Sequence, residues 1–317
     1  MKDVGEGSWE QMLRLVASTP ELQKGYVPTA VSDECFSERF ETILATQLKV
    51  IWISHPHADH LLGSVRVISE RWRILLSLNR SRVTESKPDP VIVIAPPNVL
   101  KFLLDFSFRV EETFSEMFVP VSCRQFDQKD DCTTSDVFWT AMNQQLIGTN
   151  AKYCMEASLT GDMSSSTGST TGRSAPKTRY ALVPERVRLQ AEEHLATAKK
   201  VFRDIGIRKL TNVPVIHCPQ SYGLLIEANS FFATSIDTDA ETFKLVYSGD
   251  TRPCDALIEM GLDATILIHE ATFEEDLLLE AEKKRHSTVT EALTVAKKMN
   301  AFRVILTHFS QRYPGTI

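Results

Sequence analysis

Short runs of apolar residues, each of strand length and each followed by polar or turn residues, recur along the chain. They are KVIWIS (49–54), PVIVIAP (90–96), VPVIHC (213–218), YGLLIEA (222–228), FKLVYSG (243–249), ATILIH (264–269) and FRVILTH (302–308). Their richness in Val, Ile and Leu is typical of strands that are buried on both faces. The pattern therefore predicts strands inside helix-covered sheets.

Helical periodicity fills several intervals between these runs and is clearest at residues 288–300, TVTEALTVAKKMN. Thr288 and Glu291 match the T-x-x-E capping box that begins a helix. The predicted helix carries an apolar face formed by Val289, Leu293, Ala296 and Met299. Strands that alternate with helices predict an α/β fold. A chain of 317 residues can form one large domain of this class, which we predict for residues 1–317.

Two stretches depart from this alternation. Residues 156–175, EASLTGDMSSSTGSTTGRSA, contain almost no large apolar residue, and we predict a disordered insertion there. A basic, partly helical stretch runs from Arg186 to Lys209. A solvated helix face is the favoured interpretation of this stretch, and an RNA contact is the alternative.

Charge and composition exclude some classes of function. The net charge of -6 gives no overall basic footprint, so contact with nucleic acid would require local patches. The six cysteines are scattered without a C-x-x-C pair, which favours a reducing intracellular compartment. We predict no membrane span, because no apolar run approaches the length of about 18 residues that one requires. The first residues resemble neither a signal nor a transit peptide.

The histidines gather at predicted element ends. Three of the eight fall within H-P-H-A-D-H (55–60). Seven of them lie at the end of a predicted strand or just before a predicted helix: His55, His57, His60, His217, His269, His286 and His308. Asp250 ends a run in the same manner, whereas His194 lies within a helical pattern and is given no function. Since α/β proteins build their sites at the carboxyl ends of strands, these side chains predict a functional site.

The residue types indicate a metal centre. In H-x-H-x-D-H, alternation lets His55 and His57 approach one ion while Asp59 and His60 turn toward a second. Imidazole and carboxylate ligands suit zinc or manganese, and Asp250 is the natural carboxylate to bridge two ions. A loop that is histidine-rich by accident is the disfavoured alternative. For Asp250 alone, an ordinary turn or helix N-cap competes more strongly.

The motifs also resemble a known family. H-P-H-A-D-H resembles the signature of the metallo-β-lactamase fold, which implies an αββα sandwich of two mixed sheets flanked by helices. The further motifs together resemble ribonuclease Z, the tRNA 3′-processing endonuclease, and most closely the carboxy-terminal half of its long eukaryotic form. These motifs are DVGEGSWEQM (3–12), YSGDTRPCDAL (247–257), HEATFE (269–274), RHST (285–288) and THFSQRY (307–313). The resemblance covers residues 1–63 and 190–317.

This resemblance implies a site of two Zn²⁺ ions, with Mn²⁺ as the alternative metal. It implies ligands to one ion at His55, His57 and His217, ligands to the other at Asp59, His60 and His308, and a bridge at Asp250. Asp59 is then also the expected general base, and His286 the expected proton donor to the leaving 3′ oxygen. Glu270 is expected to orient His286. His269 is expected to be structural.

The implied function is metal-dependent removal of 3′ trailers from precursor tRNA, leaving a 3′-hydroxyl on the tRNA and a 5′-phosphate on the trailer. Two alternatives stay open: another hydrolase or phosphodiesterase of the metallo-β-lactamase fold, and a truncated fragment that binds RNA or protein without cleaving.

The chain departs from the family pattern, most notably at one loop position and at its start. Pro56 stands where leucine is usual, and the chain begins almost at its D-x-G-E-G motif, so we expect truncation at the N-terminus. Beside precursor tRNA, the expected partner is a missing amino-terminal half or a second copy. The expected location is intracellular, in the nucleus, the mitochondrion or the cytoplasm.

Overall fold

The computed structural model describes residues 3–23, 36–81, 86–126, 185–229 and 242–310. The predicted insertion at 156–175 lies outside these residues. The single domain predicted for residues 1–317 stays a prediction, because much of the middle of the chain is not described.

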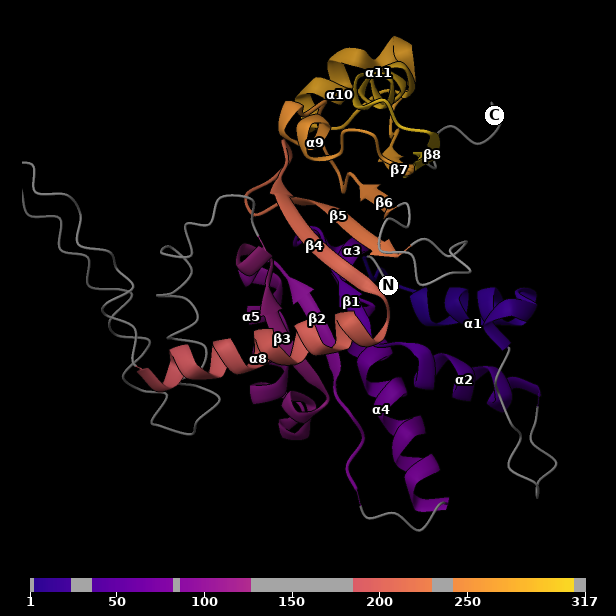
Figure 1. Ribbon diagram of the computed structural model, residues 1–317, viewed down its shortest axis with the longest axis vertical. Helices are drawn as coiled ribbons and strands as arrows, with labels where there is room; N and C mark the ends of the chain where they lie inside the picture. Colours follow the sequence, from indigo (N-terminus) through magenta and orange to yellow (C-terminus); the bar gives the residue numbers. More distant parts are fainter. Residues whose placement is uncertain (1–2, 24–35, 82–85, 127–184, 230–241, 311–317) are drawn as a thin grey trace, which may run out of the picture.

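The N-terminal part of the chain builds a three-stranded sheet with its helices (Figure 1). In chain order its elements are α1 (Ser8–Ser18), α2 (Phe36–Gln47), β1 (Val50–Trp52), α3 (Ala58–Leu61), α4 (Ser64–Ser81), β2 (Val91–Ala95), α5 (Pro97–Arg109) and β3 (Phe118–Ser122). The strands pair in the order β1-β2-β3, and both pairs are parallel.

The C-terminal part builds a five-stranded sheet. Its elements are α8 (Glu185–Asp204), β4 (Ile207–Pro214), β5 (Tyr222–Asn229), β6 (Thr242–Tyr247), α9 (Asp255–Met260), β7 (Ile266–Glu270), α10 (Leu278–Lys284), α11 (Val289–Met299) and β8 (Arg303–Thr307). The strand order is β4-β5-β6-β7-β8. Strand β5 runs antiparallel to both β4 and β6, whereas β6, β7 and β8 are parallel to one another. The four strands other than β5 therefore have their carboxyl ends at the same edge of the sheet.

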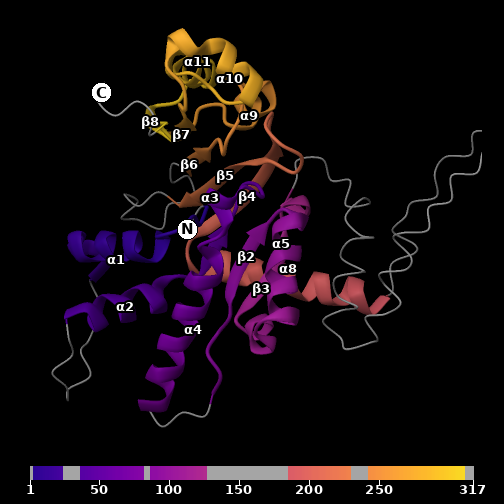
Figure 2. The ribbon, with the colours of Figure 1, turned by 180° about the vertical axis from the view of Figure 1, so that it is seen from behind.

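Alternating side chains of β2 explain the layers. Val91, Val93 and Ala95 pack with the helices outside the first sheet, whereas Ile92 and Ile94 face the second sheet. Successive strand residues point to opposite faces, so a run that is apolar at every position packs on both sides. In the view from behind, α2 and α4 lie beside each other on the outer face of this sheet (Figure 2).

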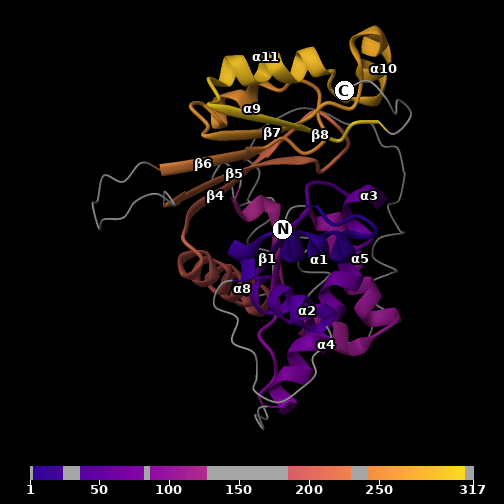
Figure 3. The same cartoon turned by 90° about the vertical axis from the view of Figure 1, so that its right-hand side faces the viewer.

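The second sheet packs its outer face against α9 and α11 through Val246, Leu267 and Val295. Its inner face joins the core between the sheets through Leu224 and Tyr247. Figure 3 shows this sheet between the N-terminal part and helices α9 to α11. The layers are therefore helix, sheet, sheet and helix, and the αββα sandwich predicted from the sequence is confirmed.

One fully buried amide ties the two sheets together. Asn212 on β4 accepts a hydrogen bond from Trp52 Nε1 (2.8 Å) and donates one to the carbonyl of Cys123 (2.8 Å), at the end of β3. Trp52 also packs edge-on against Tyr247 of β6, with ring centroids 5.8 Å apart. These contacts fix the position of β1 relative to the second sheet.

Most predicted strands are confirmed, and two differences are instructive. VPVIHC was placed wrongly, because β4 spans Ile207–Pro214. Four of the first six residues of β4, IRKLTN, are polar, and His217 lies in the loop that follows the strand. The strand β3 was missed, since proline at its centre, Pro120, is disfavoured within sheets. The position of β3 at a sheet edge accommodates that proline.

Helix α11 begins with the predicted capping box: Thr288 accepts from the amide of Glu291, and Glu291 accepts from that of Thr288. The predicted apolar face was wrong at Leu293, which is 48% exposed. The buried face instead carries Ala292, Val295, Ala296 and Met299. The basic stretch from Arg186 to Lys209 is partly helical, as predicted: it lies in α8 up to Asp204 and ends in β4.

We predict that Asn212→Ala lowers the free energy of unfolding by about 2–4 kcal/mol, because it removes one hydrogen bond from a buried indole N–H and one from a backbone carbonyl in the core. Urea unfolding followed by tryptophan fluorescence measures this loss. Asn79→Ala is the matched control, because the side-chain amide of Asn79 donates a hydrogen bond to the carbonyl of Ser86 at an exposed site. Removing this hydrogen bond should lower the free energy of unfolding by less than about 1 kcal/mol. Equal losses in the two variants would contradict the role given to Asn212.

Candidate metal centre

Loops from both sheets converge at one edge of the sandwich. His55 follows β1, His57 is the N-cap of α3, and His60 lies within α3. From the second sheet come His217 in the β4–β5 loop, Asp250 after β6, and His308 after β8. The structure thus brings together all seven side chains predicted as ligands, Asp59 included, in groups whose donor atoms lie within 4.8 Å of one another.

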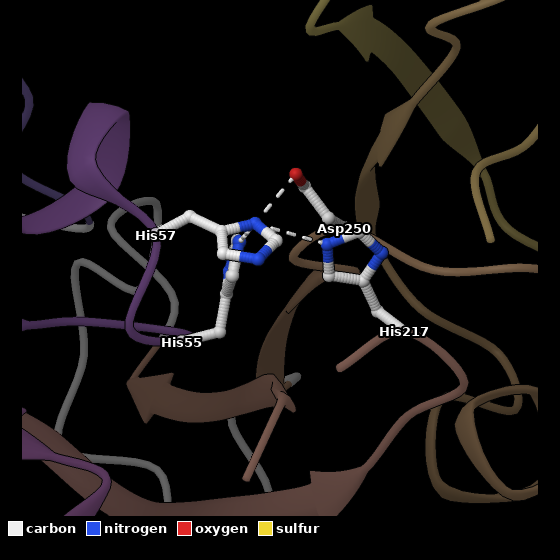
Figure 4. Close-up of side chains that lie close together, drawn as sticks. All are labelled: His55, His57, His217 and Asp250. Carbon is white, nitrogen blue, oxygen red and sulfur yellow. Dashed lines mark hydrogen bonds and ion pairs between the residues drawn. The ribbon is translucent and has the colours of Figure 1, made fainter. Parts of the chain in front are cut away.

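The first group consists of His55, His57, His217 and Asp250 (Figure 4). His57 Nδ1 lies 3.0 Å from His55 Nε2 and 3.2 Å from His217 Nε2, and His55 Nε2 lies 3.6 Å from Asp250 Oδ2. Four ligands arranged tetrahedrally at about 2.0–2.1 Å from zinc are themselves about 3.3 Å apart. The measured spacings match that geometry.

The second group consists of Asp59, His60 and His308. His60 Nε2 lies 3.4 Å from Asp59 Oδ2 and 3.3 Å from Asp250 Oδ2. His308 Nε2 lies 3.4 Å from the same Asp250 oxygen. Asp250 Oδ2 therefore borders both groups and has the position that a bridging ligand requires.

Protein contacts to the second ring nitrogen determine which nitrogen faces the cluster. The Ser54 hydroxyl donates its single hydrogen to Asp3, so it can only accept from His55 Nδ1 (2.8 Å). By the same argument Thr272, which donates to Glu270, accepts from His308 Nδ1 (2.7 Å). In both rings the lone pair is left on Nε2, which points into the cluster, as metal binding requires.

Arg285 fixes the third ring, a role that was not predicted for it although it belongs to the RHST motif. His217 Nδ1 donates to the carbonyl of Arg285 (2.9 Å), while Arg285 Nη1 donates to the carbonyl of His217 (2.7 Å). The residue adopts a left-handed conformation, with φ of 59°, as it ends α10. This conformation turns the Arg285 carbonyl toward His217 and could not be read from an arginine in the sequence.

Charge in the cluster favours a cation. Burial lowers the pKa of His60, but hydrogen bonds and charges from Asp250 and Asp3 outweigh it and raise the pKa to about 10. Burial and the charge of His60 lower the pKa of His55 to about 3, so that ring is neutral. Asp250 Oδ1 is buried and has no hydrogen-bond partner among the described residues. Imidazole nitrogens around buried carboxylates fit a divalent metal ion, which would supply the positive charge that this region favours.

A histidine and a glutamate lie beside the cluster. Glu270, 1% exposed, lies 2.8 Å from His286 Nδ1 through Oε1 and accepts from the amides of Thr251 (2.7 Å) and Ser287 (3.1 Å). The His286 ring stacks on His308 with centroids 5.5 Å apart. Burial lowers the pKa of His286, but the hydrogen bond and charge of Glu270 outweigh it and raise the pKa. Because Glu270 holds Nδ1, the other ring nitrogen is free to donate a proton.

His269 lies outside these groups. It is fully buried, and its Nδ1 donates to the carbonyl of Glu270 (2.7 Å). This position agrees with the structural role expected for it, which stays a prediction.

Asp3 supports the cluster and was not among the predicted site residues. Its carboxylate accepts from the Ser54 amide (2.6 Å) and the Tyr247 hydroxyl (2.7 Å), and it lies 3.0 Å from His60 Nδ1. The segment reaches this position because Gly5 lies against α3, where a Cβ would stand 2.2 Å from the Asp59 carbonyl. The glycines of D-x-G-E-G were the available sequence signal for this close approach.

Comparison with known proteins identifies relatives. The chain is 37% identical over 268 residues to a mitochondrial tRNase Z of Arabidopsis thaliana, covering 84% of this chain and 26% of the relative. It is 30% identical over 283 residues to ribonuclease Z of Saccharomyces cerevisiae, covering 88% and 29%. The crystal structure of a long form RNase Z from yeast superposes with a TM-score of 0.59 at 27% identity, covering 87% of this chain and 30% of that one.

The chain is related to ribonuclease Z, as its motifs predicted. It spans only 26% and 29% of the two ribonuclease Z relatives just described. The human short-form tRNase Z shares the fold, with a TM-score of 0.50 at 18% identity over 98% of this chain and 82% of that one. No family model matches the chain.

We predict that Asp3→Ala lowers the free energy of unfolding by about 3 kcal/mol or more, since hydrogen bonds to a charged group contribute about 1.5–3 kcal/mol each. Tyr247→Phe removes only one of these bonds and should cost about half as much. In the double variant the two losses should not add, because both changes remove the same contact. Urea unfolding of the four proteins measures this cycle, and full additivity would show that Asp3 and Tyr247 act independently.

Proposed function

We propose that this chain carries the catalytic centre of a metal-dependent endoribonuclease that removes 3′ trailers from precursor tRNA. The observation that supports this most is the His286–Glu270 pair beside Asp250, since a proton donor next to a two-metal ligand set suits hydrolysis with a poor leaving group. The names of the relatives support tRNA as the substrate. Because the chain spans about a quarter of their length, the activity of the whole protein is part of the proposal.

We assign His55, His57 and His217 to one ion, and Asp59, His60 and His308 to the other, with Asp250 between them. Zinc is the proposed metal because nitrogen and oxygen ligands suit it and because the Homo sapiens relative is named zinc phosphodiesterase ELAC protein 2. That relative is 28% identical over 279 residues. Mn²⁺ is the alternative. When bound, the ions lower the pKa of the attacking water and neutralise the phosphate charge.

The residues of the chain then move two protons. Asp59, whose side chain is 68% exposed, accepts a proton from the attacking water while the oxygen of that water forms a bond to phosphorus. The bond between phosphorus and the 3′ oxygen breaks, and His286 gives that oxygen a proton. Glu270 holds the charged form of His286. The products are a 3′-hydroxyl on the tRNA and a 5′-phosphate on the trailer.

The partner and the location follow from the same relatives. We propose precursor tRNA as the substrate, with further contacts supplied by an amino-terminal half or by a second copy of the chain. The relatives from Arabidopsis thaliana and Drosophila melanogaster are named mitochondrial, which supports a mitochondrial location, with the nucleus and the cytoplasm as alternatives. Across the part of the chain that the structure describes, every helix is too short or too polar to cross a membrane.

Cleavage of a precursor tRNA with a 3′ trailer, in zinc or manganese, tests the proposal. We expect one cut after the discriminator base, and kcat lower by about 10²–10⁴ in Asp59→Ala and His286→Ala. His194→Ala, in α8 and outside the cluster, is the control that should retain activity. Hydrolysis of small phosphodiesters without tRNA cleavage would favour another hydrolase. A folded, metal-loaded chain that cleaves neither would favour a binding fragment.

A further inference from the structure

Arg252 connects the loop after β6 to the segment that carries His286. Its Nη1 donates to the carbonyl of His286 (2.7 Å). Both guanidinium end nitrogens also donate to the carboxylate of Glu291, one to each oxygen. The two side chains are largely buried, at 16% and 21% exposed. A bidentate pair of this kind fixes orientation as well as distance.

Glu291 is itself fixed, because it is the third residue of α11, closes the capping box and accepts from the amide of Thr288 (2.9 Å). At the other end, the Arg252 amide donates to the carbonyl of Ile216 (3.0 Å), next to His217. Arg252 is therefore anchored at its backbone and at its side-chain partner. The carbonyl of His286 is held by a group that can move little.

Two separate contacts thus determine where His286 lies. Glu270 holds the ring through Nδ1, and Arg252 holds the backbone through the carbonyl oxygen. A displacement of about 1 Å in a reacting group can reduce a rate about a hundredfold. A contact that restricts the backbone of a proton donor therefore contributes to rate even though it lies away from the reacting atoms.

We propose that Arg252 is a positioning residue that aligns His286 to protonate the leaving 3′ oxygen. This role rests on the proposed function. The competing explanation is that the Arg252–Glu291 pair only stabilises the fold. The two explanations differ in how the effect of a substitution depends on the leaving group.

The chemistry of the step supplies the test. As the bond between phosphorus and the 3′ oxygen breaks, its electron pair stays on that oxygen, which then takes the proton of His286. If sulfur replaces the 3′ oxygen, the leaving group is a thiolate, and an ordinary thiol has a pKa of only about 8.5. Such a leaving group departs without a proton, so the contribution of His286 and of any residue acting through it should largely vanish.

The experiment uses two precursor tRNAs that differ only in oxygen or sulfur at the 3′ position of the bond to be cleaved. On the oxygen substrate we expect Arg252→Met to lower kcat by about tenfold to a hundredfold with KM unchanged. On the sulfur substrate its kcat should lie within about threefold of the wild type, as for His286→Ala. The kcat of Arg252→Lys on the oxygen substrate should lie between those of Arg252→Met and the wild type, because lysine can contact either the His286 carbonyl or Glu291 but not both. Arg73→Met, which removes an exposed arginine paired with Glu70 and Glu41, should match the wild type on both substrates.

Equal losses of kcat on both substrates, or a change in KM alone, would overturn the positioning role while leaving the proposed function standing. A wild-type chain that is inactive on both RNAs would contradict the proposed function, and this role with it. Thermal unfolding establishes that each variant folds. If Arg252→Met does not, Glu291→Gln asks the same question, since glutamine can still serve in the capping box while the charge opposite Arg252 is removed. It should show the same dependence on the leaving group, with a smaller loss.

Discussion

The arrangement of this protein depends on one buried carboxylate, Asp250. Its Oδ2 atom lies 3.3 Å from a nitrogen of His60, 3.4 Å from one of His308 and 3.6 Å from one of His55. A carboxylate that is 3% exposed is costly unless positive charge lies next to it. The surrounding imidazoles present nitrogen atoms that could bind a metal ion. At His60, whose pKa is raised, they also favour positive charge.

The two sheets contribute opposite halves of this environment, so their relative position matters. Asn212 and Trp52 tie them together through the core, away from the cluster. Asp3 ties them at the cluster, since it accepts hydrogen bonds from Ser54 after β1 and from Tyr247 at the end of β6. Asp3 accepts a hydrogen bond from the hydroxyl beside His55, and Glu270 accepts one from the hydroxyl beside His308. The contacts that join these loops therefore also fix the tautomers of the two histidine rings.

The sequence predicted the fold class and all the clustered side chains because both depend on local patterns. The predicted ligands follow apolar runs, and in an α/β fold those runs end at a common edge, so the proximity of His55 and Asp250 follows from the topology. Arg252, Arg285 and Asp3 could not be predicted from such patterns, because their roles depend on which loops meet in three dimensions. The strand β3 was not predicted because it contains a proline, which is disfavoured in strands. The strand β4 was misplaced because half of its residues are polar.

X-ray diffraction from crystals of the zinc-loaded chain, with anomalous data collected at the zinc edge, tests the central claim most directly. If Asp250 lies between two ions, the map will show two anomalous peaks about 3.5 Å apart, on either side of Asp250 Oδ2. One peak should lie among His55, His57 and His217, and the other beside His60 and His308. A single peak, or zinc bound away from Asp250, would show that Asp250 does not join two metal sites.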